Sequence, residues 1–366
     1  MTGTSSDVFC LDGRQLPELF LIGMQKCATT SMAHQLFNEW GLSEGYSFHD
    51  GSFADTKEHH FFDHAERTSK GLSYYASSFP ACGRNVLTLD ATPNYLFPRQ
   101  INDNAITKIK DMYGSERISK TTFAVLLCDP VQRAQSSFYH FREHWGDSRS
   151  FMKYTTSFNG NFNPGPYEGA LWKVGLYGPL IDAALDAFGH LVIIPATSYF
   201  ENAKRTIAVL LEEVKRRSGK VPHYTEPKGH SLHPPRLNPH PHPPLADDIN
   251  DVTLDGAFLA DFYRNSIQRV YDLVYEGVDP RVVIAPSRPQ KRFLETSAVL
   301  KRYVVTCNSC ARALPSKPPF MPPPSPPPPP SPLPPPKPPP PPSPYPPPFP
   351  PPPPPSPLPP PPPQPP

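Results

Sequence analysis

The prolines of this chain are segregated, and their distribution decides which part of it can fold. The chain has 366 residues and 58 prolines, of which 38 lie between Pro315 and Pro366. Proline lacks a backbone N–H donor, and proline runs adopt the polyproline II helix, which has no internal hydrogen bonds. We therefore predict a disordered polyproline tail at 315–366 and a linker at 286–314. Before them we expect a single folded domain at 15–285, preceded by an N-terminal extension at 1–14.

The folded body carries no excess charge, which excludes one class of partner. The tail contains Lys317 and Lys337 and no acidic residue, so removing it takes the formal net charge from +2 to zero. A nucleic-acid-binding domain needs a basic surface to neutralise phosphates. We therefore expect no nucleic-acid partner. The tail is a candidate spacer, a wall anchor that contacts wall polymers, or a ligand for proline-binding domains.

Neither a membrane span nor a secretion signal is evident in this sequence. No run of 18 apolar residues occurs, and a membrane-spanning helix needs about that length. The first 16 residues lack a basic region followed by an apolar stretch. Cys27 and Cys128 stand inside apolar elements, where we expect each cysteine to pack as a small hydrophobe without a disulfide partner.

Two groups of metal-ligand residues occur, and neither predicts a metal site. Cys307 and Cys310 form a single CxxC pair, whereas a structural zinc site usually needs a second pair of ligands. Residues 230–244 contain four histidines but also six prolines, with no cysteine or acidic residue among them. We interpret this segment as an irregular surface loop and expect no metal.

Four short apolar runs predict the strands of a parallel sheet. Each is bounded by polar or turn residues, and segments long enough for helices separate them. Continuous apolar strands joined by helical crossovers are typical of a sheet that helices cover on both faces. The predicted strands are 19–23, 86–90, 122–128 and 191–195. The predicted helices are 30–40, 99–111, 130–143, 178–188, 199–217 and 254–275, the last of which carries apolar residues at three- and four-residue steps.

The segment 19–36 (LFLIGMQKCATTSMAHQL) combines a buried strand, a polar loop and the start of an amphipathic helix. Hydroxyl residues at a helix start, with its unpaired N–H groups and a nearby lysine, can hold a phosphate. An ordinary strand–turn–helix, in which the Thr-Thr-Ser run only caps the helix, remains an alternative. The segment does not match the Walker A pattern, because it has no Gly-Lys-Ser/Thr.

Residues 25–31 (QKCATTS) resemble the 5′-phosphosulfate loop, PKxGTTSL, of the sulfotransferases that use 3′-phosphoadenosine 5′-phosphosulfate (PAPS). Further segments resemble those of the Golgi glycosaminoglycan sulfotransferases in order and spacing, from about residue 19 to 276. They are 57–63 (KEHHFFD), 71–75 (GLSYY), 90–96 (DATPNYL), 127–136 (LCDPVQRAQS), 228–229 (KG) and 262–272 (FYRNSIQRVYD). The resemblance implies an α/β fold: a P-loop NTPase-like three-layer sandwich around a central parallel sheet.

The resemblance also implies roles for individual residues. Lys26 would contact the bridging and leaving oxygens of PAPS, and Glu58 would act as general base. The remaining residues that align with the donor-binding motifs are Cys27, Ala28, Thr29, Thr30, Ser31, Cys128, Ser136, Lys228, Gly229 and His230. Such chemistry needs a cation where charge builds on the departing phosphate and a carboxylate to take the acceptor's proton. It requires no metal, because PAPS is an activated donor.

Three positions depart from the family pattern. Ala28 replaces the loop glycine, and we expect it to have a negative φ. Cys128 stands where the family has the arginine that binds the 3′-phosphate, a contact worth about 1.5–3 kcal/mol. Arg133, Lys228 and His230 are the candidates to replace it. Ala91 stands where the 3-O-sulfotransferase branch has a lysine near the acceptor, which argues against adopting that branch's substrate.

The sequence as a whole predicts a PAPS-dependent sulfotransferase that acts on the hydroxyl or amine of a carbohydrate or small-molecule acceptor. One alternative is a nucleotide kinase, against which the missing Gly-Lys-Ser/Thr argues. Another is a non-catalytic relative whose polyproline tail serves a structural or cell-wall role. The resemblance implies the Golgi lumen or the secretory pathway, although no signal or anchor is evident in this sequence.

Overall fold

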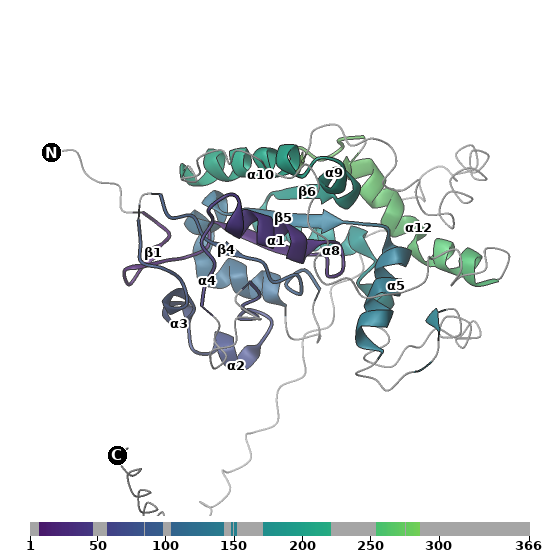
Figure 1. The fold of residues 1–366 in the computed structure, drawn as a ribbon, viewed down its shortest axis with the longest axis horizontal. Coiled ribbons are helices and arrows are strands. Elements are labelled where there is room, and N and C mark those ends of the chain that lie inside the picture. The colour runs from purple at the N-terminus through teal and green to yellow at the C-terminus, as the bar shows by residue number, and fades with distance from the viewer. Residues whose placement is uncertain are drawn as a thin grey trace, which may run out of the picture. The chain divides into compact units, whose positions relative to one another are not determined.

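A five-stranded parallel sheet forms the centre of the body (Figure 1). The computed structural model describes residues 7–46, 57–83, 85–97, 104–142, 148, 150–151, 171–220, 254–274 and 276–285, with the backbone alone for 254–261. The strands are β3 (Leu19–Gly23), β4 (Leu89–Asp90), β5 (Thr122–Leu127), β6 (Leu191–Pro195) and β7 (Val282–Ile284), in the spatial order β4-β3-β5-β6-β7.

The three inner strands are buried along their whole length. β3, β5 and β6 consist of buried residues throughout, as expected for strands covered on both faces. Their register is parallel: Leu19 lies opposite Leu89 on one side and Thr122 on the other, and Ala124 lies opposite Val192. The carboxyl ends of β3, β4 and β5 therefore lie at one edge of the sheet.

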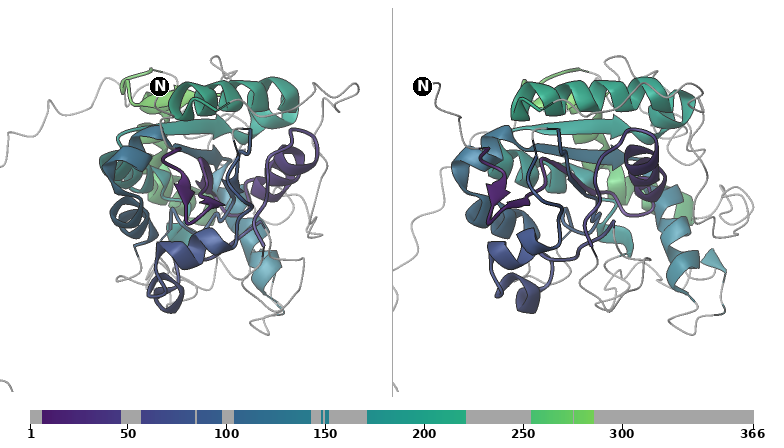
Figure 2. Two further views of the ribbon diagram at one scale, coloured as in Figure 1. Left: turned by 90° about the vertical axis from the view of Figure 1, so that its left-hand side faces the viewer. Right: turned by 60° about the vertical axis from the view of Figure 1, so that its left-hand side comes forward.

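Helices cover both faces of the sheet. Figure 2 shows α1 (Thr29–Asn38) and α4 (Ala105–Lys120) on opposite sides of the strands. α8 (Tyr177–Phe188) lies against β6, and α12 (Leu254–Val274) packs on α8, where an ion pair of 2.7 Å joins Arg269 and Asp182. The predicted α/β class, a three-layer sandwich with a central parallel sheet, is confirmed.

Shorter elements surround this sandwich. The remaining helices are α2 (Ala65–Thr68), α3 (Leu72–Ser77), α5 (Pro130–Phe141), α9 (Ala196–Glu201) and α10 (Ala203–Ser218). β1 (Cys10–Leu11) and β2 (Arg14–Gln15) form a small antiparallel pair. A disulfide joins Cys10 to Cys82, and Phe9 is buried.

Several predicted boundaries shift in the structure. The helix expected at 99–111 is α4, which continues to Lys120 across a kink at Gly114 (φ 72°). The helix expected at 199–217 is divided by Asn202, which caps α10 by accepting a hydrogen bond from Arg205 N. The strand expected at 86–90 is reduced to Leu89–Asp90. The linker and the polyproline tail lie outside the described residues, so the domain division remains a prediction.

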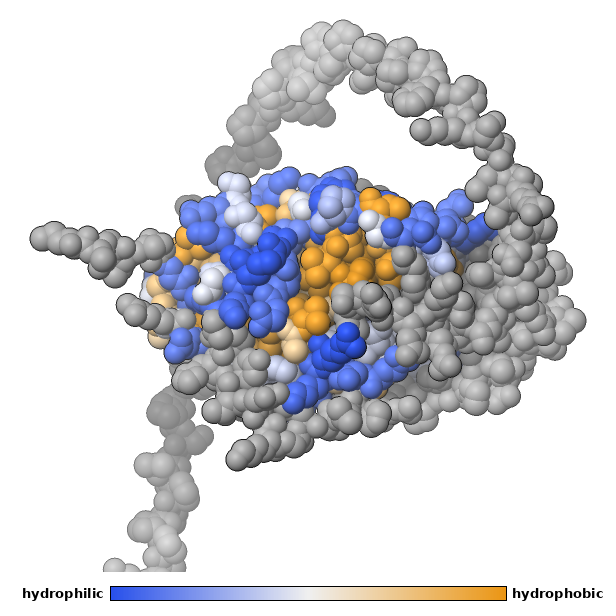
Figure 3. Space-filling view, turned by 90° about the horizontal axis from the view of Figure 1, so that it is seen from above, coloured by the Kyte–Doolittle hydropathy of each residue, from blue (hydrophilic) through white to orange (hydrophobic). Residues whose placement is uncertain are grey.

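Seen from above, the molecule carries polar residues (blue) around a group of apolar residues (orange) (Figure 3). α10 itself buries one stripe, including Ile207 and Leu210, and its last turn carries basic residues, which interact favourably with the helix dipole.

Among the helices that the structure describes, none has the length and apolar character needed to cross a bilayer.

A buried carboxylate at the end of β4 organises the carboxyl edge of the sheet. Asp90 is fully buried and accepts hydrogen bonds from the hydroxyls of Tyr75 (2.6 Å) and Tyr95 (2.9 Å). It also accepts bonds from the backbone N–H (3.1 Å) and hydroxyl (2.6 Å) of Thr92. Burial and the charge of Asp90 raise the pKa of both tyrosines well above the usual value, so both hydroxyls stay protonated donors.

This network predicts a specific loss of stability. Asp90→Ala leaves two buried tyrosine hydroxyls without their acceptor, and each such group costs about 1–3 kcal/mol. We expect the free energy of unfolding, measured with urea, to fall by about 3 kcal/mol or more. Tyr75→Phe removes one donor and leaves Asp90 its other partners, so it should cost only about 1 kcal/mol. Equal losses in the two variants would contradict the central role of Asp90.

Candidate functional site

The candidate site lies at the carboxyl edge of the sheet, where loops follow β3, β4 and β5. In parallel α/β sheets, ligands bind outside the carboxyl ends of the strands. β3 ends at Gly23, and the loop of residues 24–28 leads into α1. The sequence predicted Lys26, Cys27, Ala28, Thr29, Thr30 and Ser31 as site residues, and the structure brings all six together in this loop and the first turn of α1.

The loop has a backbone that residues other than glycine rarely adopt. Lys26 (φ 71°) and Ala28 (φ 69°) are both left-handed. The expectation of a negative φ at Ala28 was therefore wrong: the loop keeps the conformation that glycine favours and places an alanine in it. Each such residue costs about 1–2 kcal/mol, and strain of this kind concentrates at functional sites.

The hydroxyl residues after the loop do not cap α1. The N-cap of α1 is Ala28, and no side chain caps it. Thr29, Thr30 and Ser31 stand inside the first turn, with Thr29 and Ser31 buried. The interpretation of this run as an ordinary cap is therefore wrong. The N–H groups of the first turn have no intrahelical acceptor, so they remain available to an anion.

A disulfide joins the loop to the end of β5. Cys27 and Cys128 are bonded, with Cα atoms 5.4 Å apart, so the prediction of two cysteines without disulfide partners was wrong. The reason is topological: β3 and β5 are neighbouring parallel strands, and both cysteines follow at the same edge. The hydroxyl of Tyr177 donates to the carbonyl of Cys128 at 3.0 Å and lies 3.8 Å from Cys27 Sγ.

The other predicted donor-binding residues have different outcomes. Ser136 is half-buried in α5, the helix that Asp129 caps by accepting hydrogen bonds from Val131 N and Gln132 N. Arg133, a candidate to replace the missing arginine, is buried and donates through Nη2 to the carbonyl of Leu171. Its Nε and Nη1 are buried and have no hydrogen-bond partner among the described residues, so Arg133 remains a candidate for that role. The remaining predicted residues, Lys228, Gly229 and His230, lie outside the described residues.

Backbone contacts hold the segment 57–63 against the end of β4. Ala91 N donates to the carbonyl of Lys57 at 2.9 Å. His60 N donates to Thr92 Oγ1 at 3.3 Å, and Phe61 N donates to the hydroxyl of Tyr95 at 3.1 Å. Because Thr92 and Tyr95 also donate to Asp90, the carboxylate network of β4 fixes the position of this segment.

Glu58 lies between two basic side chains. Its carboxylate pairs with the ammonium of Lys57 and, at 3.2 Å, with His60 Nε2. The other ring nitrogen of His60, Nδ1, lies 2.7 Å from Asp63 Oδ2. Burial raises the pKa of Glu58, but the hydrogen bond with His60 and the charge of Lys57 outweigh it and lower that pKa to about 2.

Among the interacting residues Glu58, His60 and Asp63, His60 carries the positive charge. Burial lowers the pKa of His60, but the hydrogen bonds with Asp63 and Glu58 outweigh it and raise that pKa to about 9. His60 is therefore protonated at neutral pH and lies between two carboxylates. The family resemblance pointed to Glu58 alone; Lys57, His60 and Asp63 were not predicted, although they stand in the same KEHHFFD segment.

Lys26 and Glu58 come from distant segments and interact electrostatically. Burial lowers the pKa of Lys26 to about 8; the negative charge of Glu58 opposes this shift and the positive charge of Lys57 adds to it. The site thus combines a partly buried cation, an ionised carboxylate and a helix start with free N–H groups. Such a set can bind an anion and take a proton from a neighbouring group.

The chain resembles known sulfotransferases in sequence. No family model matches it. Over 142 residues it is 28% identical to two proteins of Mus musculus, heparan sulfate glucosamine 3-O-sulfotransferase 3B1 and 3A1. Each match covers 39% of this chain and spans only 31% of the relative's length. The resemblance to the sulfotransferases that the motifs predicted is confirmed.

The chain also aligns with a solved structure of a sulfotransferase. The crystal structure of a sulfotransferase from Alicyclobacillus acidocaldarius aligns with a TM-score of 0.46 at 19% identity, over 71% of this chain and 96% of that chain.

The loop disulfide leads to a prediction that needs no ligand. A disulfide stabilises by about 2–4 kcal/mol, and Cys27–Cys128 closes a separation of 101 residues. We expect the Cys27→Ser/Cys128→Ser variant to lose about that much unfolding free energy and to exchange the amide hydrogens of residues 24–31 at least tenfold faster. The matched control is Cys10→Ser/Cys82→Ser, which removes the other disulfide and should leave exchange in this loop unchanged. Equal exchange in both variants would contradict the prediction.

Proposed function

Because the chain is related in sequence to sulfotransferases, we propose that it transfers a sulfuryl group from PAPS to the hydroxyl or amine of a carbohydrate acceptor. The observation that carries the proposal is the electrostatic coupling of Lys26 and Glu58 across the carboxyl edge of the sheet. A lysine can stabilise the negative charge that builds on the departing phosphate, and a carboxylate can take the proton that the acceptor loses. The acceptor class is supported by the named substrate of the two relatives.

The donor side of the reaction uses the loop after β3. The first-turn N–H groups of α1, with the hydroxyls of Thr29, Thr30 and Ser31, bind the 5′-phosphate. Lys26 lies beside the bridging oxygen, which gains negative charge as its bond to sulfur breaks. A cation held there stabilises the transition state more than the ground state. Ser136 is assigned to the 3′-phosphate, and the Cys27–Cys128 disulfide holds the two sides of the donor site together.

On the acceptor side, Glu58, His60 and Asp63 act together through their mutual ion pairs. The acceptor oxygen or nitrogen forms a bond to sulfur while the bond from sulfur to the bridging oxygen breaks, and the acceptor's proton passes to Glu58. A pKa of about 2 makes Glu58 a weak base in the resting protein. The proton therefore moves late, because an acceptor becomes strongly acidic only as its bond to sulfur forms. His60 and Asp63 keep the carboxylate ionised and oriented.

We further propose that the protein folds in an oxidising compartment. Disulfides form and persist along the secretory pathway and are rare in the cytosol. All four cysteines in the described part of the chain are disulfide-bonded. This supports the compartment that the family resemblance implies. It is checked by mass spectrometry of the protein alkylated without reduction after isolation from its native cells.

One observation favours a second candidate, a non-catalytic relative. The disulfide occupies the position where the family binds the 3′-phosphate with an arginine. Loss of that contact, worth about 1.5–3 kcal/mol, corresponds to roughly a ten- to hundredfold weaker donor affinity. A non-catalytic relative would bind neither PAPS nor its product, adenosine 3′,5′-bisphosphate (PAP).

The proposal is tested with the purified full chain, radiolabelled PAPS and a panel of desulfated and neutral polysaccharides. We expect label to enter at least one polysaccharide, and Lys26→Ala to lower kcat at least a hundredfold at saturating PAPS. Transfer that persists in Lys26→Ala at near-normal kcat would remove the role assigned to Lys26. Absence of both transfer and PAP binding at millimolar concentration would leave the non-catalytic candidate.

The pKa of Lys26 predicts how PAP binding depends on pH. The neutral amine of Lys26 lacks the charge that attracts an anion, and the free protein loses this charge as the pH rises through about 8. Binding therefore weakens above pH 8, and we expect the Kd for PAP from calorimetry to rise toward tenfold per pH unit. Lys26→Arg is the matched control: arginine stays charged, so its Kd should change little between pH 7 and 9.5. Parallel curves would show that another group titrates.

A further inference from the structure

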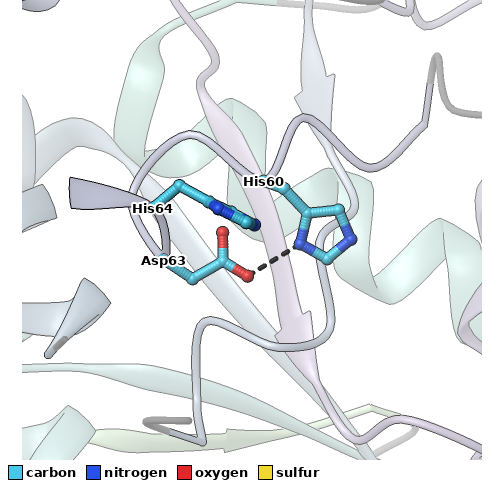
Figure 4. Close-up of side chains that lie close together, drawn as sticks. All are labelled: His60, Asp63 and His64. Carbon is cyan, nitrogen blue, oxygen red and sulfur yellow. Dashed lines mark hydrogen bonds and ion pairs between the residues drawn. The ribbon is translucent and has the colours of Figure 1, made fainter. Parts of the chain in front are cut away.

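We propose that His60, Asp63 and His64 form a binding site for a divalent metal ion of the zinc type. These residues lie within a five-residue stretch of the sequence, at the turn that leads into α2. Each offers one ligand atom, and these atoms lie within 4.8 Å of one another. Figure 4 shows the three side chains converging, with the Asp63 carboxylate between the two rings.

Asp63 supplies the first argument. Asp63 is only 5% exposed. Its Oδ2 lies 2.7 Å from His60 Nδ1, whereas its Oδ1 accepts no hydrogen bond from any described residue. A buried carboxylate oxygen without a partner is uncommon and costs free energy. A cation beside Asp63 would satisfy it.

His60 supplies the second argument, through the partner of its other nitrogen. A histidine that binds a metal usually donates its remaining N–H to a carboxylate, which fixes the tautomer and the ring orientation. His60 already has this arrangement, because Nε2 lies 3.2 Å from Glu58 Oε2 while Nδ1 faces Asp63. A metal ion would replace the proton on Nδ1 and leave the contact with Glu58 in place.

His64 completes the ligand set and provides the entry path. Its ring centroid lies 5.9 Å from that of His60, at an interplanar angle of 85°, and its side chain is not buried. Two imidazoles and one carboxylate are ligands that zinc prefers, with a fourth position left to water. Tetrahedral bonds of about 2.0–2.1 Å put ligand atoms about 3.4 Å apart, so small ring rotations close the site from its present spread.

The binding test uses Co²⁺ as a spectroscopic probe of the full chain. Tetrahedral Co²⁺ absorbs visible light strongly, and we expect bands that saturate at one equivalent and disappear when Zn²⁺ is added. His64→Asn removes one ligand and leaves the Glu58–His60–Asp63 chain intact, so it should weaken Co²⁺ binding at least tenfold. The second variant replaces the four histidines of residues 230–244 by asparagine and should keep the bands. Unchanged binding in His64→Asn, or loss of the bands in the second variant, would overturn the proposal.

An activity test separates this inference from the proposed function. His64→Asn should keep the turnover of the wild type, because His64 has no part in the proposed transfer. Cobalt bands in a protein that transfers no sulfuryl group would retain the metal site and remove the proposed function. Transfer without cobalt bands would retain the function and remove the metal site.

Discussion

The buried carboxylate of Asp90 determines where the segment 57–63 lies. It accepts four hydrogen bonds, two from the tyrosine hydroxyls of Tyr75 and Tyr95 and two from Thr92. The same tyrosine and threonine receive backbone N–H groups of the segment that carries Glu58. A residue assigned no contact with substrate thus positions the proposed base. An unpaired carboxylate at this depth is strongly unfavourable, so the network forms completely or the edge of the sheet rearranges.

The elements that the sequence predicted best are those whose signal is local and continuous. The strands Leu19–Gly23 and Leu191–Pro195 match their predicted bounds, because an apolar run flanked by polar residues marks a strand buried on both faces. The edge of the sheet was harder. β7 (Val282–Ile284) was not predicted, since three half-buried residues give no period to detect. α4 extends past Gly114 as a second helical segment, because Gly114 itself leaves the helical conformation (φ 72°) and forms a kink that the sequence pattern did not predict.

The site followed the same division between local and distant contacts. The loop of residues 24–28 and Glu58 could be predicted as site residues because each lies in a short segment with its own sequence pattern. The Cys27–Cys128 disulfide was missed because its partners are 101 residues apart and meet only through the pairing of β3 with β5. Glu58, His60 and Asp63 all lie within one predicted segment. Their ion pairs were still missed, because these depend on the directions of the side chains, which the spacing of residues in the sequence does not give.

Two departures from the family pattern are best understood as one arrangement. An alanine and a lysine in left-handed conformations, Ala28 and Lys26, each cost about 1–2 kcal/mol. A disulfide contributes about 2–4 kcal/mol, which is of the size needed to hold such a loop closed. By the family resemblance, Cys128 stands at the position of the arginine that binds the 3′-phosphate. In this chain a covalent bond joins the loop to the residue that follows β5, so the position of the strained loop does not depend on a bound ligand.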